Sequence, residues 1–210
     1  MKALHLLSLC FTAAIVFAGC STPAAFKASS ITDSEKVGIF TVRVNPHIFH
    51  GGGLAGQLSN LIVSDDKELY QTLYYLNLTD KAEHSFIDKT RSILPCSLRK
   101  MENEDAVLNS KGYFDEQKTA QKMGLSKYFY FSFWPTLSEK MTNGVSTSTF
   151  DPELRVEGKL VNTSNGKVLW KKKVARTGTP VSRYNRSDLQ QIFSGILTEV
   201  MAEITMSLKN

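Results

Sequence analysis

Hydrophobic and polar residues alternate with period two along much of the second half of the chain, which predicts strands. Lys127 to Trp134 carries three phenylalanines on one face, and its other face carries Tyr128, Tyr130 and Trp134. Glu153 to Val161 alternates in the same way. Asn165-Gly166 then predicts a hairpin turn, and Lys167 to Ala175 returns as the next strand. Between the first two strands, Thr142 to Ser148 predicts a polar turn or loop.

The end of the chain has helical periodicity instead. Its apolar stripe consists of Leu189, Ile192, Phe193, Ile196, Leu197, Val200, Ile204 and Leu208. Ser187 and Gln190 predict a capping box at its start. A one-sided helix of this length needs a sheet or another helix to cover its apolar face.

The first half of the chain predicts one strand and two helices. Lys36 to Asn45 is the strand, which Pro46 ends before a glycine-rich loop. Asp66 is placed to cap the first helix, whose leucines at 69, 73 and 76 share one face. Asp80 and Glu83 predict a capping box for the second helix, which Pro95 stops.

A third, shorter helix is predicted from Asp115 to Met123, with Gly124 at its C-terminal cap. The order of all these elements predicts an α+β fold, with a mixed, mainly antiparallel sheet packed against helices. We expect residues 36–210 to form a single compact domain that closes with the C-terminal amphipathic helix.

The apolar run from Ala3 to Phe17 follows a basic start and is too short to span a bilayer. The next residues, Phe17-Ala18-Gly19-Cys20, resemble the bacterial lipobox, although Phe17 stands where Leu is commoner. The resemblance implies that residues 1–19 are a signal peptide and that Cys20 carries the lipid. The alternative is ordinary secretion with cleavage near Ala24 or Ala25.

Ser21 stands where the inner-membrane retention signal of lipoproteins places Asp, so the resemblance implies the periplasmic face of the outer membrane. Ser21 to Glu35 has little to bury, and residues 20–35 therefore predict a lipidated, flexible tether. The covalent lipid, including palmitate, is the only added group that we expect.

Composition supports a sizeable core, with 42% hydrophobic residues and 12 Phe. Of the three cysteines, Cys10 leaves with the signal and Cys20 takes lipid, so Cys96 has no disulfide partner and is predicted to pack as a small apolar residue. The formal charge of +5 is mildly basic. It suits contact with anionic lipid or peptidoglycan, and it does not indicate nucleic-acid binding.

Two short stretches resemble a group of envelope lipoproteins. Gly124 to Phe131 is similar to the group's turn from helix to strand, with Ser126 in place of Ala. Asn165 to Trp170 is similar to its hairpin, with Asn165 in place of Thr. The group includes CsgG, LpoB and the amino-terminal domain of TolB, and the resemblance implies a compact α/β domain. These motifs are structural and imply no chemistry.

No catalytic or metal site is predicted. His50-Gly51-Gly52-Gly53 resembles an esterase oxyanion loop, but the chain has no Gly-x-Ser-x-Gly nucleophile elbow. His47 and His50 have metal-like spacing, with His84 and Cys96 as the remaining soft ligands, and nothing in the sequence brings three of them together.

Basic residues gather around the last predicted strand, namely Lys171, Lys172, Lys173, Arg176, Arg183 and Arg186. They fit either a solvated edge strand or a binding surface. Tyr128, Tyr130 and Trp134 fit either an aromatic contact patch or a second buried face. The candidate binding surface comprises Lys171, Lys173, Arg176, Arg183, Tyr128 and Tyr130.

These features predict a lipid-anchored, non-enzymatic binding or accessory component of an envelope assembly, secretion or cell-wall synthesis machine, with a protein partner. The first alternative is an oligomeric structural subunit of a secretion or surface apparatus. Against it, Glu153 to Ala175 is the only long amphipathic hairpin that the sequence predicts. The second alternative is an envelope hydrolase, which would need a cleft joining His47, His50 or His84 to carboxylates.

Overall fold

The computed structural model describes residues 28–49, 64–143, 145–182 and 187–209. These residues form a mixed sheet of seven strands with helices packed against it, which confirms the predicted α+β class. The strands are β1 (Val37–Arg43), β2 (His47–Phe49), β3 (Leu98–Lys100), β4 (Lys127–Thr142), β5 (Val145–Asn162), β6 (Val168–Thr177) and β7 (Val181–Ser182). The helices are η1 (Ala28–Ser30), α2 (Ser64–Tyr74), α3 (Thr79–Thr90), η2 (Asn103–Asp105), α4 (Glu116–Lys122) and α5 (Leu189–Met206).

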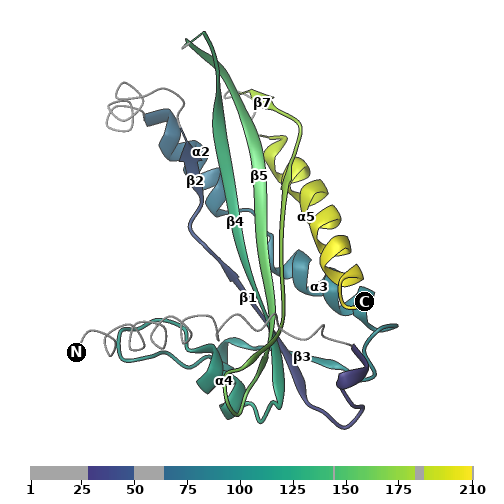
Figure 1. Cartoon of the computed structure of the whole chain (residues 1–210). Coiled ribbons are helices and arrows are strands. Elements are labelled where there is room, and N and C mark those ends of the chain that lie inside the picture. The colour runs from purple at the N-terminus through teal and green to yellow at the C-terminus, as the bar shows by residue number, and fades with distance from the viewer. Residues whose placement is uncertain (1–27, 50–63, 144, 183–186, 210) are drawn as a thin grey trace, which may run out of the picture.

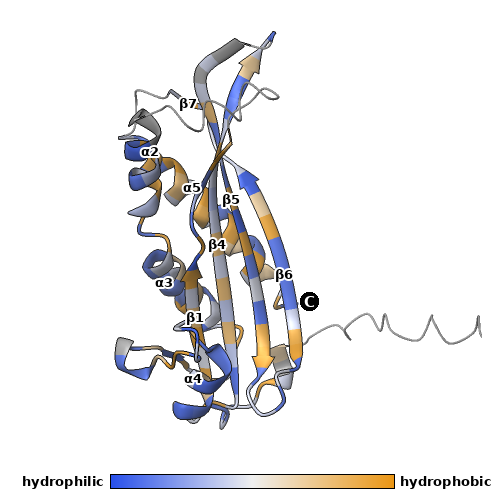
Figure 2. Cartoon of the chain, turned by 90° about the vertical axis from the view of Figure 1, so that its left-hand side faces the viewer, coloured by the Kyte–Doolittle hydropathy of each residue, from blue (hydrophilic) through white to orange (hydrophobic). Residues whose placement is uncertain are grey.

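The strand order is β3-β1-β4-β5-β6, with β2 paired to β4 beyond β1 and β7 paired to β5 beyond β6. The strands on the β1 side of β4 pair in parallel, and those on the β5 side pair antiparallel. The helices α2, α3 and α5 lie on one side of the sheet (Figure 1, Figure 2). No helix in the described ranges is both long and apolar enough to cross a membrane.

The main core lies between the sheet and these three helices. Phe129, Phe131 and Phe133 are all fully buried there, as their alternation predicts. Phe86 of α3 packs edge-on against Phe129 and Phe131, with ring centroids 4.9 and 4.7 Å apart. The predicted stripe of α5 is buried except for Ile192, which is partly buried against the same core.

Gly158 lets β5 pass close to this aromatic cluster. A Cβ at this position would lie 2.6 Å from Phe131 Cε1 and 3.1 Å from Trp170 Cη2. Trp170 is 7% exposed, so the Trp of the predicted hairpin packs into the core. Gly166 has a φ of +67° in the turn between β5 and β6, which confirms the predicted turn.

The tip between β4 and β5 differs from the prediction. Thr142 to Ser148 was expected to be a polar turn or loop, yet β4 has 16 residues and β5 has 18, and both strands reach the tip. The hairpin extends beyond the helices (Figure 1). Pro135 does not end β4 because it lies where the neighbouring edge passes from β1 to β2, so little is lost with its missing N–H.

The two predicted capping boxes do not form. Leu78 and Asp188 occupy the N-cap positions of α3 and α5, and neither makes a side-chain cap hydrogen bond. Glu83 turns to the sheet instead, where it accepts a hydrogen bond from Thr41 Oγ1 at 2.6 Å and pairs with Lys100 Nζ at 2.9 Å. The Glu83 carboxylate therefore binds to residues of the sheet and does not cap the N-terminus of α3.

Other helix ends are a mixture of confirmed and wrong predictions. Asp66 lies inside α2, which begins at Ser64, and α3 ends at Thr90, before Pro95. The ends of α4 are as predicted, because Asp115 accepts a hydrogen bond from Lys118 N and Gly124 follows with a φ of +66°.

The domain begins earlier than predicted. Ile31 is 1% exposed in the main core, and Glu35 forms an ion pair with Lys127 of β4. Ile31 and Glu35, which lie in the segment predicted as a tether, therefore contact the domain. Cys20 and residues 1–19, which are predicted to be a signal peptide, lie outside the described residues. Cys96 is a free, partly buried thiol that packs against the core, and burial raises its pKa.

Candidate functional site

The face of the sheet opposite α2, α3 and α5 is covered at one end and open at the other. At the covered end, Ala120 of α4 joins a second core cluster with Phe40, Tyr128 and Val161. Towards the hairpin tip the same face forms a groove of about 530 Å³. Its lining residues are His47, Phe49, Trp134, Thr136, Arg155, Val156, Glu157, Lys173, Val174 and Ala175. A groove of this size suits a small ligand or a short segment of a partner.

Strand β2 supplies one wall of the groove. Ile48 packs against the main core, so His47 and Phe49 on either side of it face the groove. Their rings stack with centroids 6.1 Å apart, and Phe49 is 54% exposed. The sequence did not predict this strand, because a three-residue alternation after Pro46 is too short to distinguish from a loop.

Trp134 and Arg155 lie opposite each other in the β4–β5 ladder. The Nε of Arg155 pairs with Glu153, and no further partner of its guanidinium is found among the described residues. Thr136 and Glu153 form the next pair of the ladder on this face, and Thr136 Oγ1 donates a hydrogen bond to the Glu153 carbonyl at 3.3 Å. An aromatic plane and a charged donor group are therefore adjacent on one surface.

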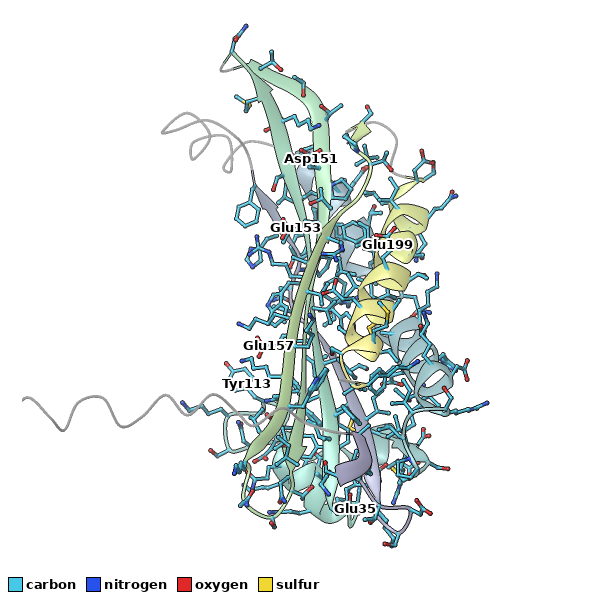
Figure 3. The ribbon with its side chains drawn as sticks, turned by 45° about the vertical axis from the view of Figure 1, so that its right-hand side comes forward. Glu35, Tyr113, Asp151, Glu153, Glu157 and Glu199 are labelled. Carbon is cyan, nitrogen blue, oxygen red and sulfur yellow. The ribbon has the colours of Figure 1, made fainter. Side chains whose placement is uncertain are left out.

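The carboxylates of this face are already paired. Asp151, Glu153 and Glu157 follow one another along β5 (Figure 3). Asp151 pairs with Lys140 at 3.1 Å, while Glu157 pairs with Lys171 at 2.8 Å and with Lys173 at 2.9 Å. Burial opposes ionisation of Glu157, but hydrogen bonds from the two lysines outweigh it and lower its pKa.

The predicted basic surface is divided between the two faces of the sheet. Lys171 and Lys173 lie on the open face with Glu157. Arg176 lies on the helix side with Lys172, and both pair with Glu203 of α5. Arg183 and Arg186 lie outside the described residues. β6 is an edge strand of the sheet, so its alternating lysines also fit the solvated-edge interpretation.

The predicted aromatic patch is divided as well. Tyr128 is 2% exposed and stacks on Phe40 with centroids 5.2 Å apart, so it is not available as a contact residue. Burial raises the pKa of Tyr128 and, less strongly, that of Tyr130. Lys159 Nζ covers the half-buried Tyr130 at 4.5 Å from its ring centroid. Of the three aromatic residues, Trp134 is the one that lines the groove.

The predicted histidines do not come together at the groove. His47 lies on the open face, whereas His84 is on α3, which packs against the other side of the sheet, and His50 is not among the described residues. No Ser or Cys is among the residues that line the groove. Within the described ranges, no three His, Cys, Asp or Glu side chains are grouped to hold a metal ion.

No protein-family model matches the sequence. No curated protein matches it significantly either. Among solved structures, the PelC dodecamer from Paraburkholderia phytofirmans is 15% identical, with 89% of this chain and 92% of that chain covered and a TM-score of 0.37. A minor lipoprotein from Acinetobacter baumannii is 6% identical, with 83% and 92% covered and a TM-score of 0.41. Lipoprotein GNA1162 from Neisseria meningitidis is 12% identical, with 80% and 99% covered and a TM-score of 0.31.

Two of these three structures are named as bacterial lipoproteins. At such identities and TM-scores, the similarity assigns neither a family nor a function to this chain. The groove and the sequence therefore carry the functional argument.

Proposed function

We propose that the protein is a lipid-anchored, non-enzymatic binding component of a bacterial cell envelope, and that it contacts a protein partner through the groove on the open face of its sheet. The observation that carries this proposal is the arrangement of Trp134, Phe49 and Arg155 around one groove. Aromatic residues and Arg are the side chains most enriched at the energetic centres of protein interfaces.

The anchor is the second part of the proposal. Cys20 follows a lipobox-like sequence, and its lipid would hold the domain at the periplasmic face of the outer membrane. Because Ile31 already belongs to the core, only residues 20–27 remain as a tether. A tether this short spans at most about 30 Å, so it holds the domain near the membrane and raises the effective concentration of membrane-bound partners.

The kinship with the CsgG, LpoB and TolB group is also part of this proposal. The two resembling stretches coincide with the α4–β4 connection and with the β5–β6 hairpin. Both stretches shape the domain, and neither contributes an aromatic side chain to the groove. The chemistry of the partner is therefore inferred from the groove residues and not from the resemblance.

The alternative of an oligomeric subunit gains support from the β4–β5 hairpin. The sequence predicted no long hairpin here, yet the strands run unbroken from Lys127 to Thr142 and from Val145 to Asn162. Past Ser138 and Thr149, the hairpin pairs with no further strand among the described residues. A hairpin that extends beyond the rest of its domain offers a template for pairing with another chain. Mass measurement after mild detergent extraction decides between a monomer and a discrete oligomer.

The proposed function is tested by photocrosslinking in intact cells. A photoreactive residue at His47 reports on the groove, and the same residue at His84 is the matched control because both side chains are exposed. We expect a discrete crosslinked protein from position 47 and none from position 84. Cys20→Ala tests the anchor, since it should remove palmitate labelling and release the protein from the membrane fraction. Equal crosslinking from both positions would argue against the groove as the partner surface.

A further inference from the structure

We propose that the occupant of the groove is an extended, acidic segment of the partner protein, with apolar side chains at alternate positions. This inference rests on the proposed function and names the chemistry of the partner. It is argued from the spacing of the aromatic rings along the groove and from the charges that the groove leaves unmatched.

The spacing of the rings matches an extended peptide. In the β2–β4 ladder His47 pairs with Thr136 and Phe49 with Ser138, so Trp134, His47 and Phe49 stand at three successive levels of the open face. Alternate residues of a strand lie about 6.6 Å apart. The 6.1 Å between the His47 and Phe49 centroids agrees with this repeat. An extended segment lying along β4 would set every second side chain against a successive ring.

The unmatched charge is positive. The carboxylates of Glu153 and Glu157 are engaged by Arg155 and by Lys171 and Lys173 respectively. Two lysines share one carboxylate, and the side chains of Lys173 and Arg155 are 70% and 64% exposed. The polar groups that remain available at the groove are therefore N–H donors with positive charge. An acidic side chain accepts hydrogen bonds from them more strongly than a neutral or basic one does.

A protein segment fits these observations better than a membrane surface does. The aromatic rings line a groove on the open face of the sheet, where a flat lipid surface would reach only the exposed rim. An acidic polysaccharide shares the negative charge but lacks the alternation of apolar side chains with charged ones. It serves as the competing ligand in the test.

The test is isothermal titration of the purified mature protein with a blocked nine-residue peptide that alternates Asp with Leu or Phe. Control ligands are the same peptide with Asn in place of Asp, the same peptide with Lys in place of Asp, and polygalacturonate as an acidic polysaccharide. The variants are Arg155→Gln and Trp134→Ala in the groove. Arg91→Gln is the matched control, because Arg91 is also exposed and ion-paired but lies at the end of α3.

We expect the acidic peptide to bind, with affinity at least about tenfold weaker for Arg155→Gln, Trp134→Ala and the Asn peptide, a change equivalent to about 1.4 kcal/mol. Arg91→Gln should bind like the wild type, and the Lys peptide should not bind.

Equal affinity for the Asp and Asn peptides, an equal loss in Arg91→Gln, or binding of polygalacturonate but not of peptide would overturn the inference. Crosslinking from position 47 with no peptide binding would overturn only the ligand class, whereas absence of both would overturn the proposed function as well. Circular dichroism of each variant verifies that the fold is retained.

Discussion

Trp134 stands directly across the β4–β5 ladder from Arg155, on the face of the sheet that the long helices leave open. The two residues are adjacent because the alternation that buries Phe133 and Leu154 on the helix side turns their neighbours to the other side. The same register that builds the core therefore builds the groove. A change that slips β4 against β5 by one residue would destroy both.

Replacing Gly158 by Ala should destabilise the domain. The added methyl group would meet the ring of Phe131 at 2.6 Å and crowd Trp170, and overpacking of this kind costs about 1 to 3 kcal/mol. Gly195→Ala is the matched control, because a Cβ at that position in α5 meets nothing within 4 Å. The control should stabilise by about 0.5 to 1 kcal/mol through helix propensity. Urea unfolding measures the free energy of unfolding of both variants. Similar values for the two would contradict the prediction, because they would show that β5 can shift to accept the added methyl group.

Glu83→Ala should lower the free energy of unfolding by about 2 kcal/mol, because it leaves Thr41 and Lys100 without their shared buried partner. The cost stays below that of a fully buried ion pair, since the side chain of Lys100 is 37% exposed. Glu199→Ala is the control at an exposed position of α5, with an expected change within about 0.5 kcal/mol. A neutral outcome for Glu83→Ala would contradict a stabilising role for this contact between α3, β1 and β3.

Ile31→Ala should cost about 2 to 3 kcal/mol, because it removes a side chain that is 1% exposed in the main core. Thr32→Ala, at the exposed neighbouring position, should change stability by less than about 0.5 kcal/mol. Thermal unfolding compares the two variants. If both were neutral, residues 28–35 would belong to the tether after all.

The ion pairs of Glu157 should give stability a specific dependence on pH. Because the folded-state pKa of Glu157 is lowered by its two lysines, its contribution is present above the ordinary glutamate pKa of about 4.3 and is lost as the pH falls through the lower folded value. The stability gap between wild type and Glu157→Gln should therefore be constant from about pH 5 to 8 and shrink below about pH 4. The gap should stay under about 1 kcal/mol, since the side chains of Lys171 and Lys173 are 47% and 70% exposed.

Denaturant unfolding across this pH range provides the measurement. The double variant Lys171→Gln, Lys173→Gln is the control, and in that background the gap produced by Glu157→Gln should no longer shrink below about pH 4. A gap that still shrinks below about pH 4 without the lysines would contradict the role of the ion pairs, because burial alone raises the pKa of Glu157 and would give a dependence of the opposite sign.

Periodicity was a reliable guide to the parts of this fold that bury one face. The alternation around Phe131 and the stripe around Val200 predicted strand, helix and core correctly, because a one-sided apolar pattern has one way to be buried. The capping boxes failed because Glu83 and Gln190 found partners on other elements, Thr41 and the backbone of Asn77. Such partners are distant in sequence and leave no local pattern.

The groove could be predicted only in part. Alternation placed Trp134 and Arg155 on outward faces of their strands, but it could not show that α4 would cover Tyr128 and leave Trp134 open. His47 and Phe49 join the groove through β2, which is too short for a period to be recognised. The division of the basic residues between two faces follows from period two, yet only the structure shows that Glu203 takes Lys172 and Arg176.

The central claim is that the groove holds the partner, and the most direct test is the crosslinking yield from position 47 in cells, measured with and without Trp134→Ala. The account predicts one discrete crosslinked protein whose yield falls at least about fivefold in Trp134→Ala, equivalent to roughly 1 kcal/mol of lost contact, while membrane association stays unchanged. An unchanged yield in the folded, membrane-bound variant would contradict the claim and place the partner surface elsewhere on the domain.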